Sequence, residues 1–177
     1  MGKYDLITAE FLKTILDYNP ETGLLVWKWR PQHMFATQKA FKIWNKRFAG
    51  KPANSKSSHG YYQVRLFNKQ YLSHILVWVL SYGCKPPYSL DHINGIRSDN
   101  RLCNLRIADN CQNSRNRKIR LDSCTRVKGV SKRGNAWCAR LDDGVTRHFL
   151  GYFKCPAAAS LAYQVAADRI FGEFARW

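Results

Sequence analysis

An aspartate, a histidine and several asparagines carry the chemistry that this sequence offers. Asp91 and His92 are adjacent in "LDHINGIRSDN", and Asn104 and Asn113 follow. A carboxylate beside an imidazole in a basic chain is typical of phosphodiester hydrolysis, because water needs a base and the developing charge needs a cation. A neutral histidine suits the base, and Mg²⁺ is satisfied by few protein oxygens, so a carboxylate and an amide are enough.

The adjacency of Asp91 and His92 constrains the local structure. Neighbouring residues on a regular strand point to opposite faces, so the two can share one site only where the strand ends or bulges. Asn94-Gly95 predicts such a turn just beyond them. We expect Asn94, Asp99 and Asn100 to form the loop rather than bind metal, and Asn110 to cap a helix. For His74 a packing role and a place near the site are both open.

The charge of the chain indicates a polyanionic partner. The 177 residues include 29 Lys and Arg against 12 Asp and Glu, a net charge of +17 that is spread along the sequence. Nucleic acid is the first candidate. An anionic membrane surface comes second, with no long amphipathic basic helix to support it. The six cysteines form no C-x-x-C pair, which argues against a zinc knuckle.

The N-terminus has no pattern of a signal peptide, and no apolar run approaches membrane length. We therefore expect an intracellular protein with reduced thiols and no membrane association.

Short helices and strands must position the four polar residues. The patterns predict a helix over 8–18 with Thr8 as its N-cap, a strand over 24–29, and a basic, irregular stretch over 31–58. A hairpin over 61–74 with its turn at 68–69 leads into an apolar helix that ends near Gly83. Strands over 88–93 and 104–109 and a helix from 110 then enclose the polar loop.

A second pattern begins beyond a boundary near 120–125. Strands over 128–134, 136–143 and 147–153 precede an Ala-rich helix over 156–172, with Pro156 near its start and Gly172 as its stop. One face of such a sheet packs on the helix and the other is free. We expect four basic residues to line the free face and contact DNA, namely Lys128, Arg133, Arg140 and Arg147.

The text "DHINGIRSDNRLCNLR…QNSRN" resembles the HNH motif of the ββα-metal nucleases, most closely the phage and intron-homing endonucleases. Asn104 and Asn113 stand twelve and twenty-one residues after His92, as in that motif. The resemblance implies that His92 is the general base, that Asp91 and Asn113 bind one metal, and that Asn104 braces the loop that orients His92. It covers roughly residues 10–118, and the third position is Asn here where many members have His.

The C-terminal sequence resembles the plant APETALA or ethylene-response-factor type of DNA-binding domain. The resemblance rests on "KGVSKRGNAWCARL", "RHFLGYF" and "AAASLAYQVAADRIFGEFA". The sequence departs from that pattern at Ser131 and Phe149, so base specificity does not carry over. We expect the basic connector before it to track the phosphate backbone, through Arg115, Arg117, Lys118 and Arg120.

The predicted fold class is α+β: a ββα-metal nuclease module with a small α+β region before it and a three-stranded antiparallel sheet packed on one helix after it. The predicted domains are a DNA-contacting region (1–58), the HNH nuclease module (59–120) and the DNA-binding domain (121–177).

The predicted function is a homing-type, phage- or intron-encoded endonuclease that cuts double-stranded DNA. Its cofactor is Mg²⁺, for which Mn²⁺ could substitute. If phage-encoded, it acts in the cytoplasm of a bacterial host. The alternatives are a transcription regulator with a silent nuclease fold and a nuclease indifferent to sequence. The sequence leaves the target site, nicking versus double-strand cleavage, protein partners and the choice of monomer or dimer open.

Overall fold

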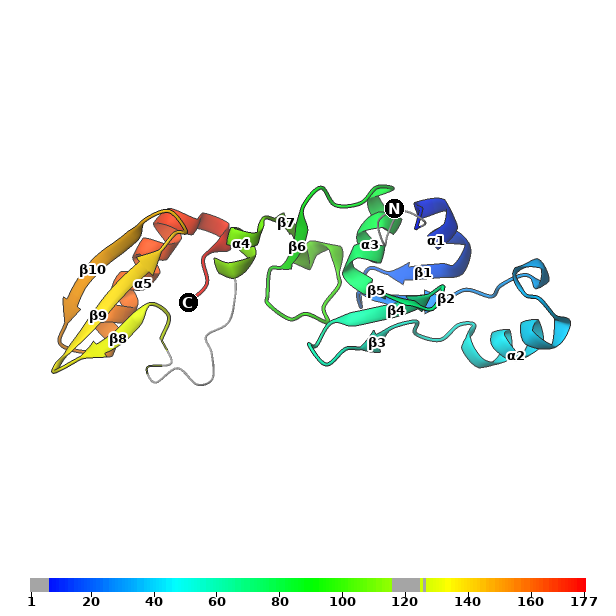
Figure 1. The fold of residues 1–177 in the computed structure, drawn as a ribbon, viewed down its shortest axis with the longest axis horizontal. Helices are drawn as coiled ribbons and strands as arrows, with labels where there is room; N and C mark the ends of the chain where they lie inside the picture. The colour runs from blue at the N-terminus through cyan, green and yellow to red at the C-terminus, as the bar shows by residue number, and fades with distance from the viewer. Residues whose placement is uncertain (1–6, 116–124, 126) are drawn as a thin grey trace. The chain divides into compact units, whose positions relative to one another are not determined.

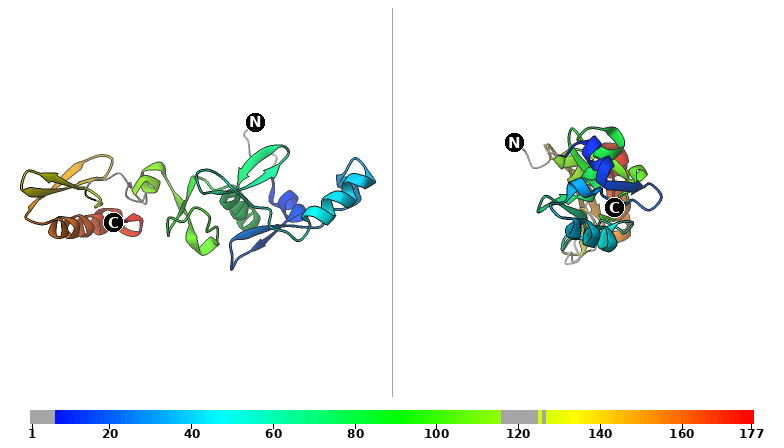
Figure 2. Two further views of the ribbon diagram at one scale, coloured as in Figure 1. Left: turned by 90° about the horizontal axis from the view of Figure 1, so that it is seen from below. Right: turned by 90° about the vertical axis from the view of Figure 1, so that its right-hand side faces the viewer.

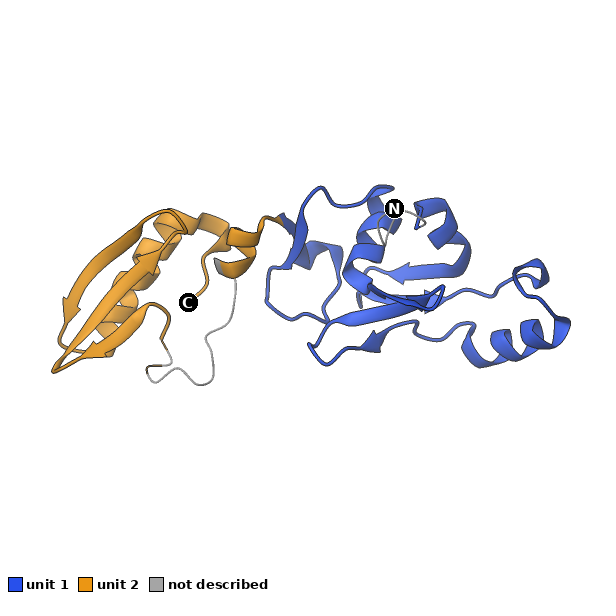
Figure 3. Cartoon of the chain, viewed as in Figure 1, with its two compact units in different colours: residues 1–107 blue, residues 108–177 orange. Residues whose placement is uncertain are grey.

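The computed structural model describes residues 7–115, 125 and 127–177. The chain divides into two compact units, residues 1–107 and residues 108–177, which Figure 3 colours separately. Helices mix with several small sheets in the described residues, so the predicted α+β class is confirmed at this level. None of the described helices is both long and apolar enough to cross a membrane.

Unit 1 combines three small sheets with short helices (Figure 1). Strand pairs β1–β2 and β6–β7 each form a two-stranded sheet, and β3, β4 and β5 form a third. The elements are α1 (Ala9–Ile15), β1 (Leu16–Asn19), β2 (Leu24–Trp27), η1 (Gln32–Met34), α2 (Gln38–Phe48), β3 (Ser55–Lys56), β4 (Tyr62–Leu66), β5 (Lys69–Leu72), α3 (Ser73–Tyr82), β6 (Ser89–His92), η2 (Leu102–Asn104) and β7 (Leu105–Ala108).

One hydrophobic core joins the elements of unit 1. It runs from Ile7 before α1 to Leu105 on β7, and its fully buried members include Leu12, Leu25 and Leu76. Residues on both sides of position 58 therefore contribute to the same core. The division into 1–58, 59–120 and 121–177 stays a prediction about roles.

Several local predictions for unit 1 are confirmed. Thr8 caps α1, its hydroxyl accepting from the Phe11 N–H at 3.1 Å. The apolar helix α3 ends at Gly83, which adopts a left-handed conformation with φ 75°. The hairpin β4–β5 forms, but its turn lies at Phe67 and Asn68, which both have a positive φ, one residue earlier than predicted.

The prediction of an irregular stretch over 31–58 is wrong, because α2 occupies Gln38–Phe48. Thr37 caps this helix by accepting from the Ala40 N–H at 3.1 Å. Phe41, Trp44 and Phe48 recur at helical spacing, a pattern that the density of basic residues obscured.

Unit 2 is an antiparallel sheet packed on one helix. The strand order is β10-β9-β8, and β10 carries a bulge between Phe149 and Gly151. Residues spaced by four along α5, from Ala159 to Phe171, are buried against Leu141 and Val130 of the sheet. The elements are α4 (Asn110–Arg115), β8 (Val130–Arg133), β9 (Ala136–Asp142), β10 (Arg147–Phe153), α5 (Pro156–Phe171) and η3 (Gly172–Phe174).

The cap of α4 differs from the prediction, which gave this role to Asn110. Asp109 is the capping residue: its carboxylate accepts from the Gln112 N–H at 2.7 Å, and the Gln112 side chain accepts from the Asp109 N–H at 2.8 Å. This reciprocal pair satisfies two donors, which Asn110 inside the helix cannot do.

Candidate active site

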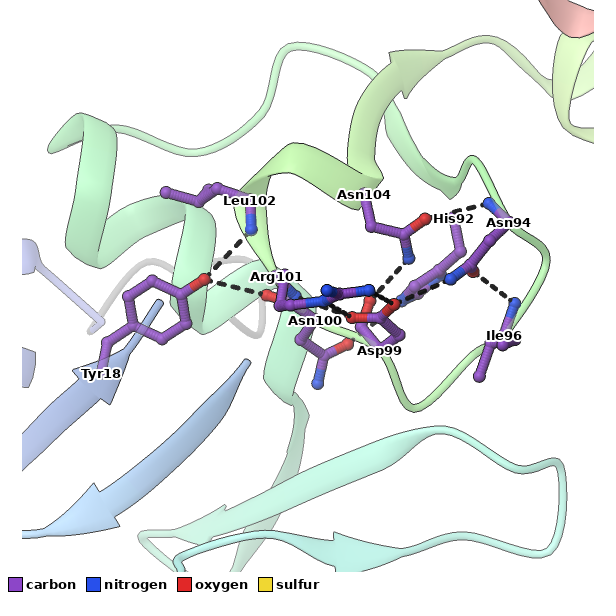
Figure 4. A network of polar contacts seen from close by, with 9 residues as sticks. All are labelled: Tyr18, His92, Asn94, Ile96, Asp99, Asn100, Arg101, Leu102 and Asn104. Carbon is purple, nitrogen blue, oxygen red and sulfur yellow. Dashed lines mark hydrogen bonds and ion pairs between the residues drawn. The ribbon is translucent and has the colours of Figure 1, made fainter. Parts of the chain in front are cut away.

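The loop between β6 and β7 is held closed by Asn104, which is 6% exposed. Its side-chain oxygen accepts from the Asn94 N–H at 2.9 Å, and its amide nitrogen donates to the Asp99 carbonyl at 2.8 Å. Its own carbonyl accepts from the Ile93 N–H at 2.9 Å. One side chain thus ties both arms of the loop, and Figure 4 shows Asn104 with its bonds to Asn94 and Asp99.

The remaining short polar residues of the loop bond to one another (Figure 4). Asn94 donates to the Asp99 carboxylate at 2.8 Å and accepts from the Ile96 N–H at 2.8 Å. Arg101 donates to the same carboxylate at 2.8 and 2.6 Å, and this hydrogen bonding lowers the pKa of Asp99 to about 2. The concentration of Asn and Asp in this stretch builds the loop, in the way their turn propensity predicts.

His92 ends β6 and is 4% exposed. Its Nε2 lies 3.1 Å from the side-chain oxygen of Asn100, a residue that is fully buried. The tautomer that carries its proton on Nε2 can donate to this amide oxygen and keeps its lone pair on Nδ1. Burial lowers the pKa of His92, although the Asn100 bond and the Asp91 charge oppose this, so the ring is neutral at pH 7.

Two further rings enclose His92. The His74 ring, at the start of α3, lies 5.1 Å from it edge to face, and the Tyr61 ring lies 5.9 Å from it. Burial and the neighbouring His92 lower the pKa of His74 to about 3. His74 therefore belongs to the neighbourhood of the site as a neutral ring, which answers the question that the sequence left open.

Asp91 is 8% exposed and forms an ion pair with Arg106 of β7. The Asp91 Oδ2 atom accepts from the Arg106 Nε and Nη2 at 3.0 and 2.9 Å. Both side chains are nearly buried, so this pair fixes the orientation of the carboxylate more firmly than a surface ion pair would.

The β1–β2 hairpin supports the loop from a distant part of the sequence. The Tyr18 hydroxyl donates to the Asn100 carbonyl at 3.2 Å, across 82 residues, and accepts from the Leu102 N–H at 3.0 Å. A β-carbon at Gly23 would lie 2.6 Å from the Arg101 nitrogen, so only glycine fits there. The residue that holds the His92 ring is thus itself held by the N-terminal hairpin.

The donor set suits a hard cation. Among the described residues no group of three or more His, Cys, Asp or Glu could hold a metal, so a site rich in nitrogen or sulfur ligands does not fit them. Asp91 offers a buried carboxylate, and Asn113 lies on α4 in unit 2. A carboxylate oxygen such as that of Asp91 is a ligand that Mg²⁺ accepts, and Mg²⁺ keeps several of its waters.

Three of the predicted DNA-facing residues share the free face of the sheet in unit 2. Arg140 pairs with Phe149, Arg147 with Asp142 and Arg133 with Ala136, which places all three arginines on the side away from α5. Lys128 is not with them: its ammonium donates to the Arg176 carbonyl at 2.9 Å, and burial lowers the pKa of Lys128 to about 8. Arg115 ends α4, and the other three connector residues, Arg117, Lys118 and Arg120, lie outside the described residues.

Sequence reasoning missed Arg106 and the bond between Asn100 and His92. Arg106 follows Asn104 by two residues and is the basic residue of β7. Because β7 pairs with β6, this position was the signal from which a contact with Asp91 could have been predicted. Asn100 had no comparable pattern, because its contact with His92 depends on how the loop folds back.

Comparison with known proteins supports the same region of the chain. Residues 71–115 match the family model described as HNH endonuclease, and this span includes Asp91, His92, Asn104 and Asn113. Searches of curated proteins and of solved structures gave no significant match. The segment that holds the buried histidine at the end of β6 and the braced loop, residues 71–115, is thus similar to an HNH endonuclease domain.

Proposed function

We propose that this protein is a metal-dependent DNA endonuclease of the homing type, encoded by a phage or an intron, that hydrolyses phosphodiester bonds in double-stranded DNA. The observation that carries the proposal is the pairing of a buried, neutral His92 with Asn100 next to the Asp91 carboxylate. A neutral imidazole with its lone pair on Nδ1 can accept a proton from water at pH 7.

His92 acts as the general base in this proposal. Its Nδ1 takes a proton from water while Nε2–H stays bonded to Asn100, and the resulting hydroxide attacks the phosphorus in line. The 3′-oxygen leaves, so the products carry 5′-phosphate and 3′-hydroxyl ends. Asn104 contributes by holding the loop that carries the Asn100 carboxamide toward the ring.

Asp91 and Asn113 are the residues that would hold the metal ion. Arg106 holds the Asp91 carboxylate through its Oδ2. Mg²⁺, or Mn²⁺ in its place, would stabilise the charge that develops on the phosphate and on the leaving oxygen.

Unit 2 supplies site preference in this proposal. Its free sheet face carries Arg133, Arg140 and Arg147 beside exposed aromatic rings at Phe149 and Tyr152. Guanidinium groups and aromatic rings suit phosphate contacts and the recognition of base edges in the major groove. The connector arginines and lysine at positions 115, 117, 118 and 120 would add sequence-independent affinity.

Supercoiled plasmid incubated with the protein, with and without Mg²⁺, tests the proposal. We expect nicked or linear products with Mg²⁺, none in EDTA, and ends that a ligase accepts without treatment. The same reaction with His92→Ala excludes a contaminating nuclease. Cutting that persists in EDTA after the protein is stripped of metal would remove the metal from the mechanism.

The alternative is a transcription regulator that binds DNA and carries a silent nuclease fold. This alternative predicts that the protein binds DNA equally well but gives no cleavage product with any divalent cation. The intact Asp91–Arg106 and His92–Asn100 pairs favour the nuclease, because a silent site has no need of a buried carboxylate and an oriented imidazole.

A further inference from the structure

Helix α2 is anchored to unit 1 by aromatic rings although none of its residues is fully buried. The Phe41 ring meets Trp29 edge to face at 5.3 Å, and the Trp44 ring meets Trp27 at 5.6 Å. Phe48 lies 5.3 Å from Trp44 on the same side of the helix. The aromatic side of α2 is therefore occupied by contacts with Trp27 at the end of β2 and with Trp29 just after it.

Polar contacts fix the same helix at its base. The Asn45 side chain accepts from the Arg30 N–H and donates to the Arg30 carbonyl, both at 2.9 Å. The Arg30 guanidinium lies over the Trp44 and Trp27 rings at 4.0 and 4.6 Å. Backbone hydrogen bonds between Trp27 and residues 50 and 51 join the segment after α2 to the end of β2. Figures 1 and 2 show α2 at the margin of unit 1, away from α3 and the β6–β7 loop.

The outer face of α2 carries exposed cations without acids. Lys39, Lys42 and Lys46 recur at spacings of three and four, with Arg47 beside them, and all four are exposed. Like charges at this spacing repel one another on an isolated helix. The chain has no acidic residue between Glu21 and Asp91, so nothing near them in sequence compensates this repulsion.

We propose that the outer face of α2 binds the backbone of double-stranded DNA on one flank of the cleavage position, so that unit 1 holds its substrate independently of unit 2. This inference rests on the proposed nuclease function and names a surface for it. Trp44 and Phe48 pack against the core of unit 1 from one side of α2, and this anchoring leaves the four cations exposed on the other side.

A membrane surface fits this face less well. An interfacial helix buries a broad apolar face in lipid, but the aromatic side of α2 already packs on unit 1. Ile43, 55% exposed, is the large aliphatic side chain between the cations. A phosphate backbone needs only accessible cations at helical spacing, which this face provides.

Salt dependence of DNA binding tests the proposal on the full-length chain in a His92→Ala background, which prevents cutting. The variant Lys42→Gln/Lys46→Gln is compared with Lys13→Gln/Lys69→Gln, which removes the same charge from exposed positions on α1 and β5 of the same unit. The probe is a generic DNA duplex over a series of KCl concentrations. We expect the magnitude of the slope of log K against log[salt] to decrease by about 0.9 for each lost phosphate contact, about 2 in all. This decrease should occur in Lys42→Gln/Lys46→Gln only.

Two further arms complete the test. Lys42→Arg/Lys46→Arg keeps both charges and should keep the parent slope. Each protein should bind the DNA duplex at least as tightly as it binds vesicles of anionic phosphatidylserine. Helical circular dichroism and thermal melting of each variant establish that α2 is still folded.

The outcomes separate this inference from the function on which it rests. A parent chain that neither binds nor cuts DNA removes the proposed function. A parent that binds and cuts while Lys42→Gln/Lys46→Gln keeps the parent slope overturns the role of α2 alone. Equal losses in both double variants also overturn it, because they indicate diffuse attraction rather than a defined face. Vesicle binding that depends on Lys42 and Lys46 would assign the face to a membrane.

Discussion

The β6–β7 loop and the free face of the unit 2 sheet use polar residues in opposite ways. In the loop, Asn100, Asn104 and His92 are buried: the Asn100 side-chain oxygen contacts the His92 ring, and the Asn104 side chain bonds to the backbone. On the sheet, Arg140 is exposed and the Phe149 and Tyr152 rings are 56% and 62% exposed. A site for bond cleavage needs fixed atoms, whereas a binding surface needs side chains that a partner can reach.

His92→Ala should have the largest effect and should separate the two regions. Losing the proposed general base should slow cleavage by about 10²–10⁴-fold, while binding to DNA stays close to the parent because the sheet is untouched. Plasmid cleavage and duplex binding measure the two effects. His33→Ala, which removes an exposed imidazole on η1, is the control. A His92→Ala protein that cuts at the parent rate would exclude His92 from the mechanism.

Gly23→Ala tests how far the fixed loop depends on the N-terminal hairpin. Its matched control is Gly50→Ala, because the two glycines have φ of 71° and 74° but an added β-carbon meets the backbone at Asn100 and Arg101 only at Gly23. The shared left-handed backbone costs about 1–2 kcal/mol in each variant.

Displacing the backbone at residues 100 and 101 should cost Gly23→Ala a further 1–3 kcal/mol, roughly the cost of overpacking. Urea unfolding measures the difference, and cleavage should fall in Gly23→Ala alone. Equal stability and equal cleavage in the two variants would contradict a supporting role for the hairpin.

Because His74 is buried, we expect it to make the stability of the folded protein depend on pH. The unfolded chain binds a proton at this residue below about pH 6.5, whereas the folded chain, where the pKa of His74 is about 3, does not. Stability should therefore fall with decreasing pH between these two values, by up to about 1.4 kcal/mol per pH unit from this residue. In His74→Gln the fall should be less steep, as urea unfolding across this range would measure. Parallel curves for parent and variant would contradict a neutral buried His74.

The smallest effect is expected on the sheet, at single exposed charges. Arg140→Gln should lower the salt slope of DNA binding by about 0.9 and leave the stability nearly unchanged. Lys128→Gln should do the reverse: it removes the bond to the Arg176 carbonyl, so it should lower stability by about 1 kcal/mol and leave the slope as it is. Binding over a KCl series and urea unfolding give both quantities. A lower slope for Lys128→Gln would return that residue to the DNA-facing set.

Local spacing in the sequence predicted most individual elements. The Thr8 cap, the end of α3 at Gly83, the strands β6 and β7, and the sheet and helix of unit 2 follow from short patterns of apolar, capping and turn residues. Helix α2 and the cap at Asp109 were missed because a basic composition and an adjacent Asn masked patterns that are equally local. The four candidate site residues were chosen through their resemblance to the HNH motif, which is a spacing of residue types along the chain.

The sequence by itself determined which residue types are available and at which spacings: an Asp-His pair, two asparagines downstream, and a large excess of cations. The tertiary structure alone decided that the Asn100 side chain contacts His92, that Arg106 holds Asp91, and that Tyr18 and Gly23 support the loop from the N-terminal hairpin. The physical reason is distance along the chain. Periodicity records which neighbours share a face, but contacts across 82 residues form only when separate elements pack on one core.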